Sequence, residues 1–211
     1  DDLGASEKAA LRAELGIPEG AVAIGLPGRI TRGKGQALWV EALGRLAERG
    51  PGQAWQGVLI GGLAAGEGSD EAVVAELRER VSELGLASRV SFVGFRSDLP
   101  SCLKALDIVC VPSRNEAFGL TVIEAMAAAR PVVGSSSGAI PELINEQTGR
   151  LADPDVPEAW VTALVELLED VQLRERLGAA GRQRVQEAFT LAGHVAALVE
   201  EYAGQEGASE T

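Results

Sequence analysis

Short apolar runs alternate along the chain with longer segments in which apolar residues recur every three or four positions. Short continuous runs are typical of buried strands, and the longer spacing is typical of helices that cover a sheet. Strands are predicted at 21–26, 57–60, 89–93, 106–111, 131–134 and 149–152. Short buried strands that alternate with helices predict an α/β fold, with a parallel sheet of about six strands and helices on both faces.

Helices are predicted between these strands and after the last of them. The shorter ones are expected at 35–49, 74–84, 98–105, 119–129 and 140–143, and two longer ones carry apolar residues from Trp160 to Val171 and from Val185 to Tyr202. We therefore predict one Rossmann-like domain over residues 1–204 and a polar, flexible tail over 205–211. In such sheets ligands lie at the carboxyl ends of the strands.

Composition and charge narrow the possible partners. The 211 residues carry a net charge of −12 and the sequence pI is about 4.6, so a broad basic surface for nucleic acid is not expected. Cys102 and Cys110 lack the spacing and the histidine partners of a metal site, and Cys110 is expected to be buried in a strand. The sequence contains neither a signal-peptide pattern nor an apolar run long enough to cross a bilayer. We expect a cytoplasmic protein without a membrane span.

A glycine-rich basic loop follows the first predicted strand. It reads Gly28-Arg29-Ile30-Thr31-Arg32-Gly33-Lys34-Gly35 and leads directly into a helix. Glycine lets the backbone approach a ligand closely, and the two cations at Arg29 and Lys34 suit a diphosphate. The loop has the spacing of neither a P-loop nor a dinucleotide-binding fingerprint. Taken alone, it is interpreted equally well as a solvated turn with two surface cations.

Glu116 and Glu124 stand eight residues apart around the start of the helix that follows the fourth strand. Glu116 precedes the helix N-terminus, and Glu124 lies more than a turn inside the helix. Unpaired N–H groups at a helix start bind anions, and carboxylates accept hydrogen bonds from hydroxyls. Phosphate at the amides and hydroxyls at the carboxylates together describe a nucleotide-sugar. The alternative is a polar helix entry with a capping role, but Gly119 is a poor helix former and favours close approach of a ligand.

These motifs together resemble a known enzyme family. Gly28-Arg29 with Lys34-Gly35, the segment 112–127, Pro131-Val132-Val133 and Thr148-Gly149 look like the group-1 (family 4) retaining glycosyltransferases of the GT-B fold. The whole chain is similar to their C-terminal, donor-binding domain. The Glu-x7-Glu element and the basic loop are highly specific in combination, whereas either alone is less so.

The resemblance implies a role for each matching residue. Arg29, Lys34 and Glu116 would be the catalytic residues: the two cations, next to Gly28, stabilise the leaving diphosphate, and Glu116 contacts hydroxyls of the transferred sugar. Glu124 would accept hydrogen bonds from the ribose. The remaining donor contacts are expected mainly from the backbone. The helix start would hold the sugar and the phosphate through Phe118, Gly119, Leu120 and Thr121. The loop after the third strand would border the base through Phe95 and Arg96.

The resemblance also implies that neither metal nor cofactor is needed, because cations and amides replace the metal. The donor would be a UDP-, GDP- or ADP-sugar. An N-terminal, acceptor-binding half of the same enzyme would complete the active site and supply a histidine near the reacting sugar. We therefore expect this chain alone to bind donor weakly and to transfer sugar negligibly. The base, the sugar and the acceptor are not specified by the sequence.

Some residues depart from the family pattern. Ala129 replaces a usual glycine, Ser137-Gly138 replaces a usual Gly-Gly pair, and the loop 61–69 is acidic. These departures affect the expected sugar more than the fold. A sugar-nucleotide epimerase or a phosphorolytic enzyme of the same fold, and a non-catalytic nucleotide-binding module, are the alternatives.

Several other residues are expected to be structural. Asp153-Pro154-Asp155 resembles the metal-binding motif of a different glycosyltransferase fold, but Asp155 is expected to cap the following helix. His194 has no catalytic partner within reach by sequence. Trp39 and Trp160 lie in helical apolar patterns and are expected in the core, whereas Trp55 at a strand edge stays undecided.

Overall fold

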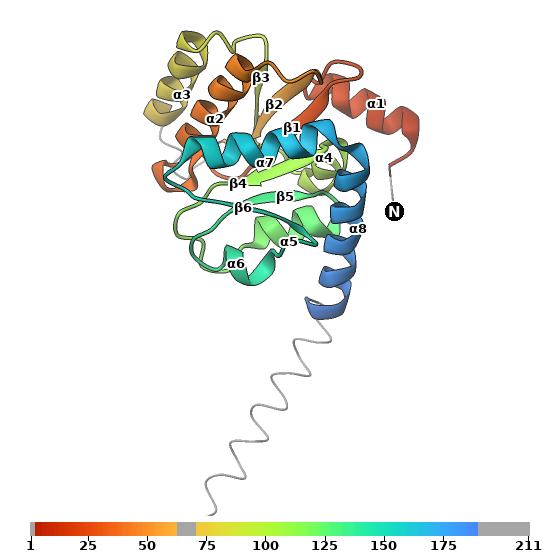
Figure 1. Ribbon diagram of the computed structural model, residues 1–211. Coiled ribbons are helices and arrows are strands. Elements are labelled where there is room, and N and C mark those ends of the chain that lie inside the picture. Colours follow the sequence, from red (N-terminus) through yellow and green to blue (C-terminus); the bar gives the residue numbers. More distant parts are fainter. Residues whose placement is uncertain (1–2, 63–70, 190–211) are drawn as a thin grey trace, which may run out of the picture.

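Six parallel strands form one sheet in the order β3-β2-β1-β4-β5-β6 (Figure 1). The computed structural model describes residues 3–62 and 71–189. The strands are β1 Val22–Pro27, β2 Trp55–Ile60, β3 Val90–Gly94, β4 Ile108–Val111, β5 Val132–Ser135 and β6 Gly149–Ala152. The predicted α/β fold is confirmed, and the ends of the predicted strands differ from the observed ones by at most two residues.

Helices separate the strands and cover the sheet on both faces (Figure 1). They are α1 Ala5–Glu14, α2 Gln36–Arg49, α3 Glu71–Glu83, α4 Leu99–Ala105, α5 Leu120–Ala127, α6 Ile140–Leu143, α7 Pro157–Glu169 and α8 Val171–Ala188, with a short 3₁₀ turn at Arg32–Lys34. The predicted helix 119–129 is shorter than expected and ends at Ala127.

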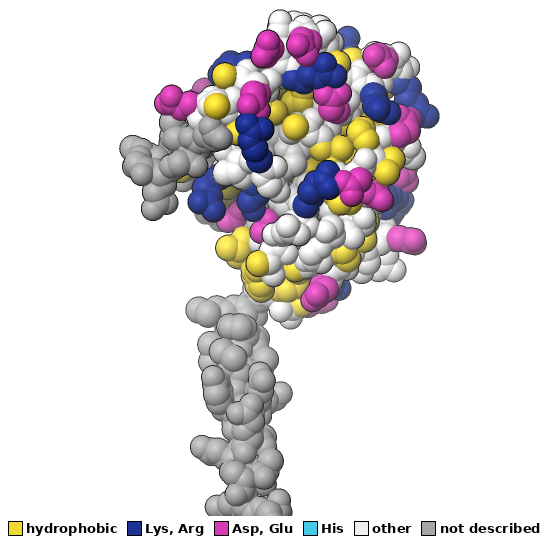
Figure 2. All heavy atoms as spheres, turned by 90° about the vertical axis from the view of Figure 1, so that its left-hand side faces the viewer, with side chains coloured by type: hydrophobic (Ala, Val, Ile, Leu, Met, Phe, Trp, Pro, Cys, Tyr) yellow, Lys and Arg dark blue, Asp and Glu magenta, His cyan; other side chains and the backbone are white. Residues whose placement is uncertain are grey.

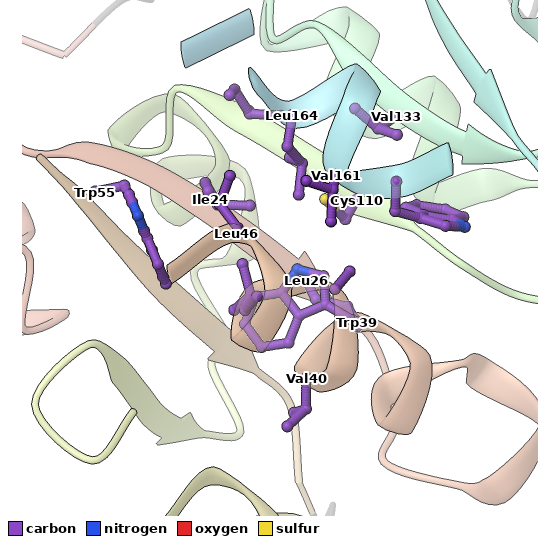
Figure 3. Close-up of a cluster of buried hydrophobic side chains, with 14 of the residues drawn as sticks. Ile24, Leu26, Trp39, Val40, Leu46, Trp55, Cys110, Val133, Val161 and Leu164 are labelled. Carbon is purple, nitrogen blue, oxygen red and sulfur yellow. The ribbon is translucent and has the colours of Figure 1, made fainter. Parts of the chain in front are cut away.

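Two apolar clusters lie on opposite faces of the sheet, because alternate residues of each strand point to opposite sides. In β1, Ile24 joins the cluster under α2, α3 and α7, whereas Ala23 joins the cluster under α4, α5 and α6. Figure 3 shows the first cluster, where side chains of α2 and α7 meet those of β1, β4 and β5. Burial on both faces explains why β1, β2, β4 and β5 read as continuous apolar runs.

The tryptophan and cysteine predictions are confirmed. Trp39 and Trp160 are fully buried, and Trp55 is also buried, with the Arg89 guanidinium 5.3 Å from its ring centre. Cys110 is buried in β4, where burial raises the pKa of its thiol to about 12. This thiol therefore behaves as a small apolar group.

Helix α1 is absent from the sequence-based prediction because it lacks a buried apolar face. None of its residues is buried, and the guanidinium of Arg12 anchors it instead. Arg12 Nη1 donates to the Ala105 carbonyl at 2.8 Å and to Asp107 Oδ2 at 2.9 Å, while Nη2 donates to the Ala21 carbonyl. The helix is thus held by these polar contacts and by Leu11, which packs against the cluster under α5.

The boundary between the last two helices also differs from the prediction. Val171, which fits the apolar spacing of the first of them, begins α8 and is 53% exposed. Asp170 ends α7, and its carboxylate caps α8 by accepting from the Leu173 N–H at 2.8 Å. Of the predicted helix from Val185 to Tyr202, the part beyond Phe189 lies outside the described residues, as do His194 and the tail 205–211.

The prediction that Asp155 caps α7 is wrong. The N-cap of α7 is Val156, and Pro157 occupies the first helical position. The Asp155 N–H donates to the carboxylate of Asp153 at 2.8 Å, and the Asp155 carboxylate pairs with Arg114. Asp153 therefore stabilises a turn, and Asp155 forms an ion pair with Arg114.

Helix α8 contacts both faces of the domain. Leu173 and Leu177 belong to the cluster under α7, whereas Val185 and Phe189 pack against the cluster under α5. At Gly178 a Cβ atom would lie 2.2 Å from the Ala129 carbonyl oxygen, so α8 passes directly over the end of α5.

Ala129 is the non-glycine residue with positive φ in the described ranges, at +55°. Left-handed backbone costs an alanine roughly 1–2 kcal/mol, and glycine adopts it freely. We expect Ala129→Gly to stabilise the fold by about 0.5–1 kcal/mol, after the larger unfolded-state entropy of glycine is subtracted. Urea denaturation measures this difference. Ala127→Gly, at the last residue of α5, is the matched control and should destabilise by up to about 1 kcal/mol; two losses of equal size would contradict the strain at Ala129.

Candidate functional site

The crevice between the ends of β1 and β4 is the point where the strand order reverses. The chain leaves β1 for α2 on one face of the sheet and leaves β4 for α5 on the other. The connecting loops separate there, and ligands of doubly wound sheets bind at such a switch point. Both motifs singled out in the sequence, the loop 28–35 and the loop 112–119, lie at this crevice.

Two glycines hold these loops in direct contact with their neighbours. Gly35 has φ +75°, and a Cβ atom there would lie 2.2 Å from the Pro112 carbonyl oxygen. Gly138 has φ +63°, and its Cβ would lie 2.7 Å from the Glu116 carbonyl oxygen, which also accepts from the Ala139 N–H. The loops after β1, β4 and β5 therefore converge.

Lys34 and Glu116 form an ion pair at the centre of this convergence. The Lys34 Nζ lies 2.8 Å from Glu116 Oε2, although the residues are 82 positions apart in the sequence. Burial would raise the pKa of the Glu116 carboxyl. The hydrogen bond and charge of Lys34, with hydrogen bonds from the Ser113 hydroxyl and the Gly119 N–H, hold that pKa below its ordinary value. Glu116 is therefore a carboxylate at neutral pH.

Helix α5 begins next to this carboxylate. Gly119 is its N-cap with φ +85°, and a Cβ there would lie 2.5 Å from Leu143 Cδ1. Glycine at 119 is thus required by backbone conformation and by the contact with α6. Within residues 3–62 and 71–189, the N–H groups of Leu120 and Thr121 donate no hydrogen bond, as is usual at a helix start. They offer an anion two donors and the positive end of the helix dipole.

Arg29 lies at the tip of β1 with its side chain exposed. Its carbonyl accepts a 2.8 Å hydrogen bond from Gln36 Nε2, and its guanidinium forms no ion pair in the described part of the chain. The neighbouring Arg32 instead pairs with Glu76 of α3 at 2.7 Å. Of the loop cations, Lys34 thus pairs with Glu116, Arg32 pairs with Glu76, and Arg29 is exposed at the tip of β1.

The remaining predicted donor-binding residues differ in how far they are engaged. Phe95, after β3, is 62% exposed, and Phe118 is 56% exposed. Arg96 is bound on both sides: its guanidinium makes two 2.7 Å hydrogen bonds to Asp98 and pairs with Glu14 of α1. The structure thus orients Arg96 toward α1 and α4.

Glu124 lies on α5 without a hydrogen bond to its side chain from any residue within 3–62 or 71–189. The residue as a whole is exposed, while partial burial raises the pKa of its carboxyl. A carboxyl with an unmet need for donors suits hydroxyl groups of a ligand.

Sequence analysis missed three contributors to this site. Ser113 is buried and donates to Glu116, Gln36 is buried and holds Arg29, and Ala139 donates to the Glu116 backbone. Gln36 and Ser113 each stand beside a recognised motif residue. Their burial depends on packing between loops, which no local pattern reveals.

On the side of the molecule toward which β4 points, basic side chains lie among hydrophobic, uncharged and acidic ones (Figures 1 and 2). The basic side chains on this face are thus individual cations on a chain with a net charge of −12. Across 3–62 and 71–189 there is no group of three His, Cys, Asp or Glu side chains placed to hold a metal ion. A helix both long and apolar enough to span a bilayer is likewise not found among these residues.

The fold and the crevice define a doubly wound, Rossmann-like α/β domain in which Lys34, Glu116 and the start of α5 meet at the switch point. The chain belongs to the family of group 1 glycosyl transferases, whose family model matches residues 7–184. The predicted membership, with the GT-B fold, is therefore confirmed.

Relatives of known name support this assignment. The chain is 35% identical over 170 residues to the D-inositol 3-phosphate glycosyltransferase of Corynebacterium glutamicum, covering 79% of this chain and 40% of that protein. It is 35% identical over 202 residues to the lipopolysaccharide core biosynthesis mannosyltransferase LpsB of Rhizobium meliloti, covering 93% and 55%. The chain thus spans about half the length of the curated relatives it matches.

Solved structures agree. A crystal structure of Anabaena Alr3699/HepE in complex with UDP-glucose has a TM-score of 0.84 and 27% identity, covering 96% of this chain and 54% of that one. The C-terminal domain of the group 1 glycosyl transferase LpcC of Francisella tularensis has a TM-score of 0.74 and 29% identity. That match covers 89% of this chain and 95% of the LpcC domain, so this chain corresponds to a C-terminal half.

Proposed function

We propose that this chain is the donor-binding half of a retaining glycosyltransferase that takes its sugar from a nucleoside diphosphate sugar. The observation that carries the proposal is the meeting of Lys34, Glu116 and the open start of α5 at the switch point. Cations and amides there suit a diphosphate, and the carboxylates suit hydroxyls. The likeness to HepE, solved with UDP-glucose, supports a nucleotide-sugar as the donor class.

The proposed chemistry follows from charge. As the sugar leaves, negative charge develops on the outer phosphate of the nucleotide. Arg29, Lys34 and the amides of Leu120 and Thr121 are fixed donors that gain most when this charge is complete, so they stabilise the transition state. In this proposal they take the place of a metal ion, and Glu116 orients the sugar through its hydroxyls.

The acceptor site belongs, in this proposal, to a preceding half of the enzyme. The chain covers 40% of the Corynebacterium glutamicum enzyme and 54% of HepE, so much of each relative lies outside the match. Without that half the acceptor is not positioned and water is not excluded from the crevice. This chain alone is therefore expected to bind donor and to transfer sugar negligibly.

Titration calorimetry of the folded chain with UDP, GDP and ADP, each with and without an attached glucose, tests the proposal. We expect one of the three nucleotides to bind with a dissociation constant in the micromolar to millimolar range. A folded chain that binds none of them would contradict the donor-binding role and favour a module that serves only in assembly. Release of free sugar at enzyme-like rates would contradict the predicted inactivity.

Glu124→Ala tests the ribose contact. We expect this variant to bind the preferred nucleoside diphosphate more weakly by about 1–3 kcal/mol, roughly 5- to 150-fold, because the ribose hydroxyls lose a charged acceptor. Its melting temperature should barely change, since Glu124 is exposed. The 2′-deoxy nucleotide should bind wild type and variant more equally than the ribonucleotide does.

Glu48→Ala, which removes an exposed carboxylate on a different helix, α2, is the matched control and should bind like wild type. An unchanged affinity of Glu124→Ala, or an equal loss in both variants, would remove Glu124 from the site.

A further inference from the structure

Gln36 is a buried polar side chain for which the proposed donor chemistry has no direct use. It is the first residue of α2 and is 2% exposed. Its Nε2 donates to the Arg29 carbonyl at 2.8 Å, and this partner fixes the orientation of the amide, because a carbonyl accepts only from the NH₂ group. Its Oε1 is buried and finds no partner among the described residues.

The hydrogen bond of Gln36 closes the basic loop. Gln36 lies seven residues after Arg29, so the bond ties the start of the loop to the helix that ends it. Between them, the Lys34 N–H donates to the Thr31 carbonyl at 3.1 Å and forms the 3₁₀ turn. No other hydrogen bond within residues 3–62 and 71–189 reaches the Arg29 carbonyl. The direction of the backbone that carries the Arg29 side chain therefore depends on Gln36.

The unpaired Oε1 indicates that the Gln36–Arg29 hydrogen bond is kept although glutamine at this position lowers the stability of the fold. A buried acceptor without a partner destabilises the folded state, and a leucine of similar size would avoid that loss. Gly35, the residue before Gln36, contacts Pro112 and so fixes the last residue of the loop, opposite the end that carries Arg29. Both ends of the loop are thus anchored, one by close packing and one by the Gln36 amide.

We propose that Gln36 is a positioning residue for donor binding: its Nε2 hydrogen bond to the Arg29 carbonyl holds the Arg29 guanidinium at the donor diphosphate. The inference rests on the proposed function and deepens it, because it assigns diphosphate affinity to a side chain that does not touch the donor. The effect is expected to be specific to the phosphate end of the ligand, since the proposed ribose contact, Glu124, lies on α5 and not on the basic loop.

The test compares Gln36→Leu with wild type, using UDP in calorimetry and uridine in NMR titration, or whichever nucleoside diphosphate binds wild type together with its nucleoside. Gln36→Leu should weaken nucleoside diphosphate binding about tenfold and leave nucleoside binding, measured by NMR titration, within twofold. A merely structural role would weaken both. Gln36→His keeps an N–H donor toward the carbonyl and should recover most of the loss.

Gln56→Leu is the matched control. Gln56 is also buried, at 5% exposure, and its Nε2 donates one hydrogen bond, at 3.0 Å to Ser91 Oγ in the neighbouring strand. This substitution should change stability and leave the affinity for the nucleotide unchanged.

A double-mutant cycle with Arg29→Ala completes the experiment. If Gln36 acts through Arg29, Gln36→Leu should cause less than a twofold further loss in the Arg29→Ala background. A full tenfold loss there, a wild-type affinity of Gln36→Leu, or an equal loss of nucleoside binding would each overturn the inference. Should Gln36→Leu fail to fold, weak diphosphate binding by folded Gln36→His would overturn it. Failure of wild type to bind any nucleoside diphosphate would instead remove the proposed function itself.

Discussion

Gly35→Ala is expected to destabilise the fold by about 2–4 kcal/mol and to weaken nucleoside diphosphate binding by roughly tenfold or more. Two effects add. The left-handed backbone at φ +75° is strained for alanine, and the new methyl group would lie 2.2 Å from the Pro112 carbonyl oxygen. Relief of the clash requires the loops after β1 and β4 to separate, which would move Lys34 away from Glu116. Urea denaturation and calorimetry measure the two effects.

Gly33→Ala is the matched control in the same loop. A Cβ atom at Gly33 meets nothing within 4 Å, and the residue does not have positive φ. This variant should change stability by less than about 1 kcal/mol and should bind nucleotide almost as wild type does. Equal behaviour of the two variants would show that the contact between the loops is not needed for binding.

The Lys34–Glu116 pair gives the second large effect, with opposite signs for its two members. Lys34→Met should weaken nucleoside diphosphate binding by about 1.5–3 kcal/mol, roughly 10- to 150-fold, because a charge-assisted hydrogen bond to phosphate is lost. Glu116→Gln should strengthen it, roughly three- to tenfold, because an anion that competes for Lys34 at 2.8 Å becomes neutral. For the nucleotide-sugar this gain should disappear, since the carboxylate that accepts from the sugar hydroxyls is gone.

Calorimetry with the nucleotide and its sugar derivative measures both signs. Lys8→Met, a half-buried lysine on α1, is the control and should bind as wild type does. Weaker binding of the plain nucleotide by Glu116→Gln would contradict the competition for Lys34.

The same pair predicts a pH dependence of stability. The pKa of the Glu116 carboxyl is lowered in the folded state from an ordinary value of 4.5. The stabilisation is therefore fully present above pH 4.5 and is lost as the pH falls through the lowered pKa. The difference in melting temperature between wild type and Glu116→Gln should accordingly shrink below pH 4.5. A difference that is constant with pH would contradict this.

The strands and most helices are predictable from the sequence because their signals are local. The strands β1, β2, β4 and β5 are buried on both faces and read as apolar runs, and α2 shows apolar residues at helical spacing. Helix α1 escapes prediction because its anchor, Arg12, binds groups 93 and 95 residues away. The break at Asp170 escapes prediction because Val171 continues the apolar spacing across a capping residue.

The site is predictable in its parts and not in its pairing. The basic loop and Glu116 each have a recognisable chemical pattern, so their location at one edge of a parallel sheet follows from the fold class. That Lys34 reaches Glu116 depends on β1 lying beside β4, which is a property of strand order. The roles of Ser113 and Gln36 depend in the same way on contacts between loops.

Helix α8 has a consequence for the way the domain unfolds. Its first turns pack against the cluster under α7, and its last turns pack against the cluster under α5. Neither cluster can therefore unfold while the helix stays in place. The two halves are therefore expected to melt cooperatively, as a single unit, although a six-stranded sheet separates them.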